Sequence, residues 1–232
     1  MVENFGAYLL TSYIFLAGAS RGVGREIAKQ LTAQNFKLKA LLRTDAAAAE
    51  LEALNIQVVL GDALNIDDVE RAILTGEPIH AVISTIGGLP VDSERADFLG
   101  NKNLIDAAVK GGVQKFILVS SIGSGNSAVA LPPQALKTLG PVLTEKDKAE
   151  KHLIASGLTY TIIRPGGLKS EPATGNGILT EDPRIAGSIN RADVAQLVVR
   201  SLNSQRTNNK VLSAIDRNML FGQPEFAELS LE

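Results

Sequence analysis

The chain has 232 residues, of which 45% are hydrophobic and 21% charged, so it can bury one continuous core and does not have the composition of a disordered protein. A formal net charge of -2 at pH 7 provides no basic surface for a phosphate backbone, which argues against a nucleic-acid partner. The absence of cysteine excludes disulfides, thiolate zinc sites and a cysteine nucleophile, so redox chemistry must come from a cofactor.

The apolar residues give no sign of a membrane segment or an export signal. No apolar run approaches the roughly 20 residues of a spanning helix, and no charged segment precedes the first run as in a signal peptide. We therefore expect a cytoplasmic protein with a single domain over residues 1–232 and no membrane partner. With two histidines and no cysteine, we expect no metal site. The sequence does not indicate an oligomeric state.

Short apolar runs alternate along the chain with longer segments of helical periodicity, as in βαβ units. The runs predicted as buried strands are 13–17, 38–42, 58–60, 81–84, 116–120, 160–163 and 211–215. The segments predicted as one-sided helices are 22–34, 46–54, 66–74, 97–109, 144–155 and 191–201. The predicted fold class is therefore α/β, a Rossmann-type doubly wound and mainly parallel sheet of about seven strands with helices on both faces.

Two segments rich in glycine and proline, 122–141 and 166–189, interrupt this alternation. Each follows a predicted strand. Because ligands of open parallel sheets bind beyond the carboxyl ends of the strands, we expect these irregular segments to form walls or lids of a substrate pocket. The alternative is that they are surface insertions without a role in binding.

The most specific local signal is the segment 15–28, FLAGASRGVGREIA, in which a strand leads through a glycine loop into a helix. Gly18 permits the tight turn, Gly22 lets the backbone approach a pyrophosphate, and Gly24 lets the helix pack closely on the sheet. The helix N-terminus presents N–H groups to the anion. The residues of this loop predicted to bind the cofactor are Gly18, Ser20, Arg21, Gly22, Val23 and Gly24. The alternative is a purely structural turn.

The residue at the end of the second strand indicates which dinucleotide binds. NAD-specific sites place an acidic residue there to bind the ribose 2′-hydroxyl, whereas this chain has Arg43. Together with Arg21, this arginine could bind a 2′-phosphate through charge-assisted hydrogen bonds, which favours NADPH over NADH. The alternative is that Arg43 is a solvated residue at a strand end.

Residues after the third and fourth strands complete the predicted adenosine site. Asp62, followed by Ala63, is placed to accept a hydrogen bond from the adenine amino group. Thr85, Ile86 and Gly87 would line the adenosine ribose. Both groups could instead serve only their own turns.

The chain resembles the short-chain dehydrogenase/reductase superfamily, specifically its atypical branch with the NmrA-like proteins and the biliverdin-IXβ/flavin reductases. The resemblance rests on the glycine loop, Arg43, the pair at 61–62 and the segments 81–83, 112–116 and 120–121. The segments 156–160 (SGLTY), 164–166 (RPG) and 172–175 (PATG) are its most specific part. The family implies that Ser120 and Ser121 lie under the nicotinamide. It also implies that Pro165, Gly166, Gly167 and Leu168 line the far side.

The chain departs from the superfamily at the catalytic tyrosine. Typical members carry Tyr-x-x-x-Lys in the fifth helix, where the lysine lowers the tyrosine pKa for proton transfer. The register predicted here places Thr144 at the tyrosine position and Lys148 at the lysine position. Without a phenol, ordinary alcohol or ketone chemistry is disfavoured, whereas an electron-poor conjugated acceptor takes hydride directly.

The sequence therefore predicts an NADPH-dependent reductase of a planar small molecule, either a flavin such as FMN or a linear tetrapyrrole like biliverdin. Ser121 would orient the carboxamide or the acceptor, and Lys148 would contact the nicotinamide ribose. Each could instead be an ordinary polar residue, at a strand end or on an outward helix face. The alternative function is a non-catalytic NADP-binding sensor or assembly factor. Thr144 disfavours a third candidate, a sugar-nucleotide epimerase or ketone reductase.

Overall fold

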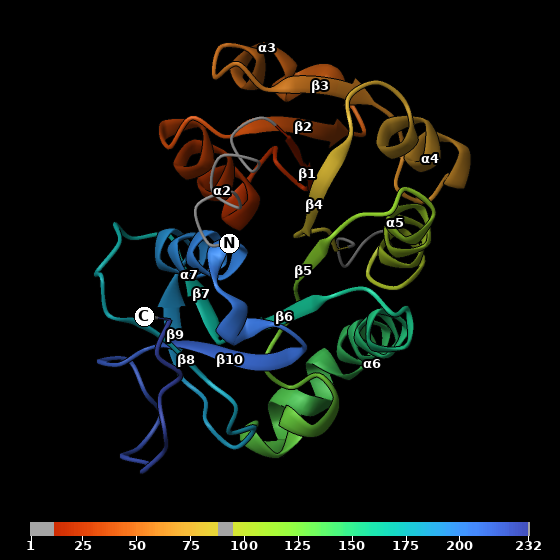
Figure 1. The fold of residues 1–232 in the computed structure, drawn as a ribbon. Helices are drawn as coiled ribbons and strands as arrows, with labels where there is room; N and C mark the ends of the chain where they lie inside the picture. Colours follow the sequence, from red (N-terminus) through yellow and green to blue (C-terminus); the bar gives the residue numbers. More distant parts are fainter. Residues whose placement is uncertain (1–11, 88–94, 232) are drawn as a thin grey trace.

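The computed structural model describes residues 12–87 and 95–231, and the remaining residues of the predicted domain lie outside this description. The strands are β1 (Tyr13–Ala17), β2 (Lys37–Leu42), β3 (Gln57–Leu60), β4 (Ile79–Ser84), β5 (Lys115–Val119), β6 (Tyr160–Pro165), β7 (Gly167–Lys169), β8 (Gly177–Thr180), β9 (Ser188–Asn190) and β10 (Lys210–Asp216). Within the described residues, eight strands form one sheet in the order β3-β2-β1-β4-β5-β6-β10-β8, and β7 pairs with β9. The large sheet runs from top to bottom in Figure 1.

Helices cover both faces of the large sheet. They are α2 (Gly22–Ala33), α3 (Ala48–Glu52), α4 (Ile66–Leu74), α5 (Leu99–Lys110), α6 (Pro133–Ala155) and α7 (Arg191–Asn203), with short 3-10 helices at Asp45–Ala47, Gly125–Ala130 and Gln205–Thr207. Figure 1 shows α2 and α7 on one side of the sheet and α4, α5 and α6 on the other. Ile27 of α2 and Val198 of α7 are buried in one core, and Leu104 of α5 and Leu153 of α6 in the other. The predicted doubly wound fold class is confirmed.

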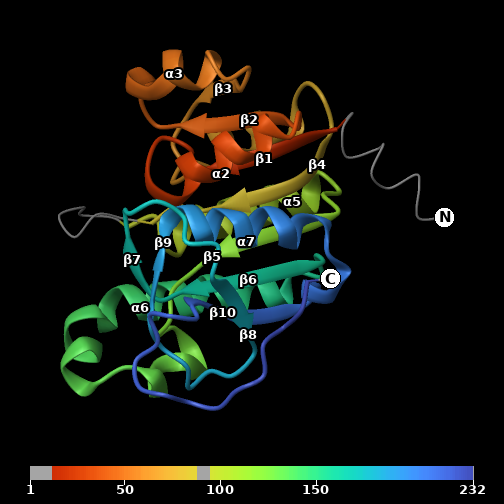
Figure 2. The ribbon, with the colours of Figure 1, turned by 90° about the vertical axis from the view of Figure 1, so that its left-hand side faces the viewer.

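The strand order reverses between β1 and β4. The chain builds β1, β2 and β3 outward on one side and β4, β5 and β6 outward on the other, with all of these pairs parallel. Ligands of such sheets bind at the carboxyl ends of the strands beside this switch point. Figure 2 shows these ends on the left, together with β7, β9 and the first turns of α6. The loops after β1, β4, β5 and β6 therefore surround the candidate site.

The segment 122–141 is more regular than its composition predicts. It contains the 3-10 helix Gly125–Ala130 and the first part of α6, which begins at Pro133 and not at residue 144. Gly140 and Pro141 resemble a helix break, but the proline removes only one N–H donor and the residues around it are largely exposed. Pro133 occupies the first helical position, where its fixed φ favours a helix. The prediction of an irregular segment was wrong here.

The segment 166–189 also contains regular structure. It includes β7, most of β9 and the edge strand β8, which runs antiparallel to β10, and the sequence did not predict any of these three strands. The four residues of β8 stand between glycine-rich stretches, and so short a run carries no periodicity. The seven predicted strands are all present. Within residues 12–87 and 95–231, no helix is both long and apolar enough to cross a membrane.

Candidate functional site

The glycine loop after β1 leaves room for backbone only. Gly18 has a φ of +93°, and a Cβ on Gly24 would lie 2.1 Å from the carbonyl oxygen of Gly18 and 2.6 Å from Thr85 Oγ1. Helix α2 begins after Arg21 without a side-chain cap and without an acidic residue in its first turn. Among the described residues, its first N–H groups therefore have no side-chain cap, and its first turn has no carboxylate to repel an anion, which are the conditions under which helix N-termini bind phosphate. This cradle fits the pyrophosphate of a dinucleotide.

Three of the predicted cofactor residues support the loop from beneath. The Thr85 N–H donates to the Ala17 carbonyl at 3.0 Å, and Thr85 Oγ1 lies 3.3 Å from the Gly18 carbonyl. Val23 is buried in the core under α2, and Ile86 packs, partly buried, in the core on the other face. Their side chains thus hold the shape of the loop, and Val23 could contact a cofactor only through its backbone.

Two arginines lie at the loop, Arg21 within it and Arg43 beside it. Ala17 of β1 pairs with Leu41 of the parallel strand β2, so Arg43, two residues further on, follows β2 next to the glycine loop. Arg43, Arg21 and Ser20 are exposed, and neither arginine forms an ion pair within the described part of the chain. Unpaired guanidinium groups favour an anionic ligand such as a 2′-phosphate. A preference for NADPH stays a prediction.

Asp62 and Ala63 lie in a turn after β3 that is held by local hydrogen bonds. Asp62 Oδ1 accepts a hydrogen bond from the Leu64 N–H at 3.0 Å, and the Asp62 N–H donates to Asp68 Oδ2 at 3.0 Å. The hydrogen bond from this N–H is the main cause of the lowered pKa of the Asp68 carboxyl. The Ala63 carbonyl accepts from Asn103 Nδ2 at 2.9 Å. The turn chemistry that the sequence left open is therefore present, and a ligand would have to use the second carboxylate oxygen of Asp62.

The lysine of α6 that faces this site is Lys146. Its Nζ lies 3.1 Å from Asp97 Oδ1 and would lie 3.5 Å from a Cβ on Gly87, the predicted cofactor residue after β4. Lys148 Nζ instead pairs with Glu145 at 2.6 Å and its side chain is half exposed. Residues two positions apart on an α-helix point about 200° apart, so the two lysines cannot share one face. We therefore move the predicted ribose contact from Lys148 to Lys146.

A buried polar network lies under the end of β5. Ser120 Oγ donates to Glu150 Oε1, and Arg164 binds the same carboxylate with both Nε, at 3.1 Å, and Nη2, at 2.5 Å. Glu150 and Arg164 are 1% and 5% exposed. Ser121 is partly exposed, and its Oγ donates to the carbonyl of Ile122 at 3.0 Å. Of the two predicted serines, Ser121 is thus the more accessible one, and Ser120 is held in place by Glu150.

The residues after β6 are only partly available to a ligand. Pro165 is buried in β6, and the Gly166 N–H donates to a β10 carbonyl at 2.9 Å. A Cβ on Gly166 would lie 2.2 Å from the carbonyl oxygen of Gly187, so this glycine is required by a close backbone approach. Gly167 and Leu168 are exposed at the carboxyl end of the sheet. Of the four predicted residues 165–168, only Gly167 and Leu168 are therefore exposed enough to contact an acceptor.

A lysine with a lowered pKa lies at the opposite end of the sheet. Burial lowers the pKa of Lys115, at the start of β5, to about 8. Such a shift can mark a functional site, but Lys115 Nζ donates to the carbonyls of Ser201 at 2.6 Å and Ser204 at 2.9 Å. Both carbonyls belong to the C-terminal end of α7, where a cation is favourable. Lys115 therefore caps α7 and does not belong to the dinucleotide site.

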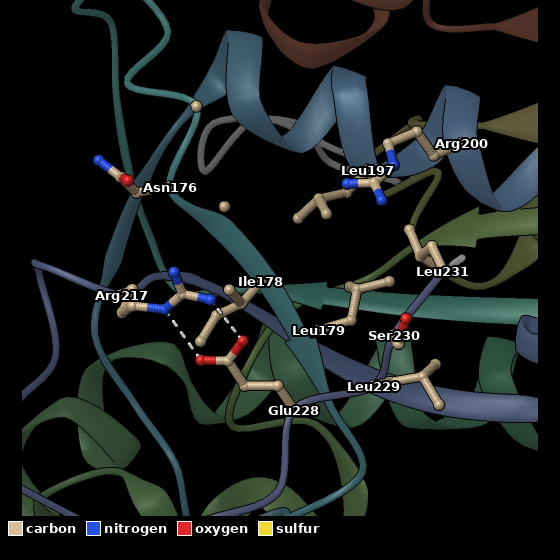
Figure 3. A pocket seen from close by; sticks show the side chains of 12 residues that line it. Asn176, Ile178, Leu179, Leu197, Arg200, Arg217, Glu228, Leu229, Ser230 and Leu231 are labelled. Atoms are coloured by element: carbon tan, nitrogen blue, oxygen red, sulfur yellow. Dashed lines mark hydrogen bonds and ion pairs between the residues drawn. The ribbon is translucent and has the colours of Figure 1, made fainter.

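A cavity of about 330 Å³ lies between β8, α7 and the segment 228–231. Figure 3 shows Leu179 of β8, Leu197 of α7 and Leu229 around it, with Arg217 and Glu228 paired at its edge. Residues 175–179 of its lining belong to the segment predicted to wall a pocket. However, the cavity lies along the edge strand β8 and is not lined by the glycine loop. We therefore do not assign the acceptor to this cavity.

The chain matches the family model described as NAD(P)H-binding over residues 18–205. An uncharacterized chloroplastic protein of Arabidopsis thaliana is 36% identical over 218 residues, which cover 89% of this chain and 78% of that protein. YhfK of Bacillus subtilis, named an uncharacterized sugar epimerase, is 33% identical over 202 residues, which cover 85% of this chain and 91% of that protein.

Several solved structures are similar over almost the whole chain, and one of them has a described activity. ChuY of Escherichia coli O157:H7, named an anaerobilin reductase, has a TM-score of 0.82 and 33% identity, and the match covers 92% of this chain and 100% of that chain. The span of the family match begins at Gly18 and contains Arg43, Lys146 and the start of α7. It therefore includes the cradle and the residues around it.

Proposed function

This chain belongs to the NAD(P)H-binding family, and we propose that it is an NADPH-dependent reductase that transfers hydride to a flavin or a linear tetrapyrrole. The observation that carries the proposal is the cradle at the switch point, which Lys146 faces and which no tyrosine of the described residues faces. Four residues before Lys146, where the superfamily's spacing would place the tyrosine, stands Val142. The protein therefore has a means of holding the cofactor without the usual proton donor.

The two tyrosines among the described residues lie at the opposite end of the sheet from the cradle. Tyr13 opens β1 and Tyr160 opens β6, so both lie toward the amino ends of the strands, whereas the cradle lies at the carboxyl ends. Tyr8 lies outside the described residues. An aliphatic hydroxyl such as that of Ser121 does not replace a phenol as a proton donor near neutral pH. An electron-poor conjugated acceptor needs no such donor, which supports a flavin or a tetrapyrrole as the substrate.

When bound, NADPH supplies the hydride, and the residues of this chain supply binding and orientation. The glycine loop would hold the pyrophosphate, Lys146 the nicotinamide ribose, and Ser121 the carboxamide or the acceptor. Rate enhancement then comes from positioning a planar acceptor against the nicotinamide. The name of ChuY supports a bilin among the acceptors. The sugar epimerase named for YhfK is a weaker model, because Val142 stands where the superfamily's spacing would place the tyrosine that carbinol chemistry uses.

The purified protein should oxidise NADPH in the presence of FMN, riboflavin or biliverdin, which NADPH absorbance measures. Lys146→Met should lower the turnover about tenfold or more through loss of positioning, whereas Lys148→Met should change it little. Thr144→Val should also stay active, because the Thr144 hydroxyl donates to the Gly140 carbonyl on an exposed helix face.

Tight NADPH binding without turnover of any acceptor would contradict the enzymatic proposal. It would favour the alternative, a non-catalytic NADP-binding sensor or assembly factor. Equal losses in Lys146→Met and Lys148→Met, with folding intact, would instead contradict only the position of the ribose contact.

Arg43→Ala should remove most of the preference for NADPH over NADH. Charge-assisted hydrogen bonds contribute about 1.5 to 3 kcal/mol each, so losing one should weaken NADPH binding about tenfold or more. NADH affinity should stay nearly unchanged, because the 2′-hydroxyl carries no charge. Calorimetric titration of both dinucleotides measures this, with the exposed Arg206 at the other end of the sheet changed to alanine as the control. Equal or tighter NADH binding by the unmodified protein would contradict the assignment.

A further inference from the structure

Arg191, the first residue of α7, lies against the glycine loop although it is far from that loop in the sequence. Helix α7 packs beside α2, as Figure 1 shows. A Cβ on Gly22 would lie 3.7 Å from Arg191 Nε and 3.9 Å from its Cδ, so the arginine side chain runs alongside the loop. Gly22 is the loop residue whose lack of a side chain lets a pyrophosphate approach. Arg191 therefore places a guanidinium at the edge of the cradle.

The other end of the same guanidinium holds the chain after β6. Arg191 Nη1 donates to Ser170 Oγ at 2.7 Å and lies 3.4 Å from the Leu168 carbonyl oxygen. A guanidinium has five N–H donors in a planar fork. Among the described residues, neither Nε nor Nη2 of Arg191 has an acceptor. The side of the fork nearest Gly22 thus keeps its donors available, while the opposite side is occupied by the segment 168–170.

Two further residues at the start of α7 hold the rest of this segment. Asn190 Nδ2 donates to the Pro172 carbonyl at 3.0 Å. The Asp193 carboxylate accepts from the N–H groups of Thr174, at 3.0 Å, and Gly175, at 2.8 Å. Asp193 is 1% exposed, and its carboxylate oxygens are engaged by these hydrogen bonds. The exposed segment 168–175 therefore depends on the first turn of α7 for its position, with Arg191 at the end nearest the cradle.

We propose that Arg191 is a pyrophosphate-binding residue that couples the cofactor to the segment 168–175. Its Nε and Nη2 bind the pyrophosphate of NADP(H) while Nη1 keeps its contacts with Leu168 and Ser170. Cofactor binding then orders this segment beside the exposed residues 167–168, where the acceptor is expected. The inference rests on the proposed cofactor site and adds a residue to it that the glycine-loop motif does not include.

The test is calorimetric titration of wild type and Arg191→Lys with two ligands, NADP⁺ and adenosine 2′-monophosphate. The second ligand carries the 2′-phosphate but no pyrophosphate. A lysine keeps the charge but cannot bridge two sites as the planar fork does. We expect Arg191→Lys to bind NADP⁺ about tenfold or more weakly and adenosine 2′-monophosphate as tightly as wild type. Arg200→Lys, an exposed position on the same helix, is the matched control and should match wild type with both ligands.

Hydrogen exchange of the segment 168–175 gives a second readout, independent of turnover. NADP⁺ should slow exchange there in wild type and in Arg200→Lys, and should slow it less in Arg191→Lys. Wild-type NADP⁺ affinity in Arg191→Lys, or protection of the segment that does not depend on Arg191, would overturn the inference. Failure of wild type to bind either ligand would instead overturn the proposed cofactor site.

Discussion

A Gly24→Ala variant should lose NADP(H) affinity by about a hundredfold or more, because the added Cβ has no place in the loop. It would lie 2.1 Å from the Gly18 carbonyl oxygen, which is a backbone atom, and 2.6 Å from Thr85 Oγ1. The turn at Gly18 needs its φ of +93°, and Thr85 is hydrogen bonded to the same turn, so the loop cannot shift without losing these bonds. Opening the loop would displace the N–H groups that form the cradle.

Calorimetric titration of NADP⁺ measures this loss, and thermal unfolding without ligand shows whether the variant is folded. The control is Gly140→Ala in α6, where a Cβ meets no atom within 4 Å, and which should keep wild-type affinity. Wild-type affinity in a folded Gly24→Ala variant would mean that the pyrophosphate does not bind in this loop.

The sequence predicted the site best where the residues that form it are contiguous in the chain. The strand, the loop and the helix of the cradle are contiguous in residues 15–28, so their spacing alone predicts their geometry. The register that we predicted for α6 placed Lys148 at the site, whereas Lys146 faces it, although the sequence pattern of α6 holds a signal that distinguishes the two lysines. The buried residues Ala149 and Leu153 mark the face that packs on the sheet, and Lys146 lies three positions before Ala149 on that face. Lys148 does not share this spacing.

The sequence alone did not predict contacts between segments that are far apart along the chain. Arg191 reaches Gly22 only because α7 returns to pack beside α2, and an arginine at a helix start is otherwise an ordinary surface residue. In the same way, the sequence gives no sign that Glu150, on a helix, and Arg164, at the end of a strand, are partners. Tertiary packing buries both and makes each the partner of the other.

Glu150→Ala should lower the free energy of unfolding by about 3 to 5 kcal/mol, which is the usual cost of removing one partner of a buried ion pair. Arg164, only 5% exposed, would lose both hydrogen bonds to the carboxylate and stay buried as an uncompensated charge. Ser120 Oγ would lose the same acceptor. Arg164 Nη1 also donates to Asn126 at 2.5 Å, so the 3-10 helix beside the site should loosen as well. Equilibrium unfolding in urea measures the effect.

The double variant Glu150→Leu with Arg164→Met distinguishes the lost charge balance from lost packing. Because it removes both charges and keeps apolar volume, it should recover most of the stability that Glu150→Ala loses. Glu145→Ala, which breaks the exposed pair with Lys148 on the same helix, should cost less than about 1 kcal/mol. If Glu150→Ala were no more damaging than Glu145→Ala, the buried pair would not hold the end of β5 against α6. The support of Ser120, which we predict to lie beneath the nicotinamide, would then have to come from the backbone hydrogen bond between Ser120 and Ile163.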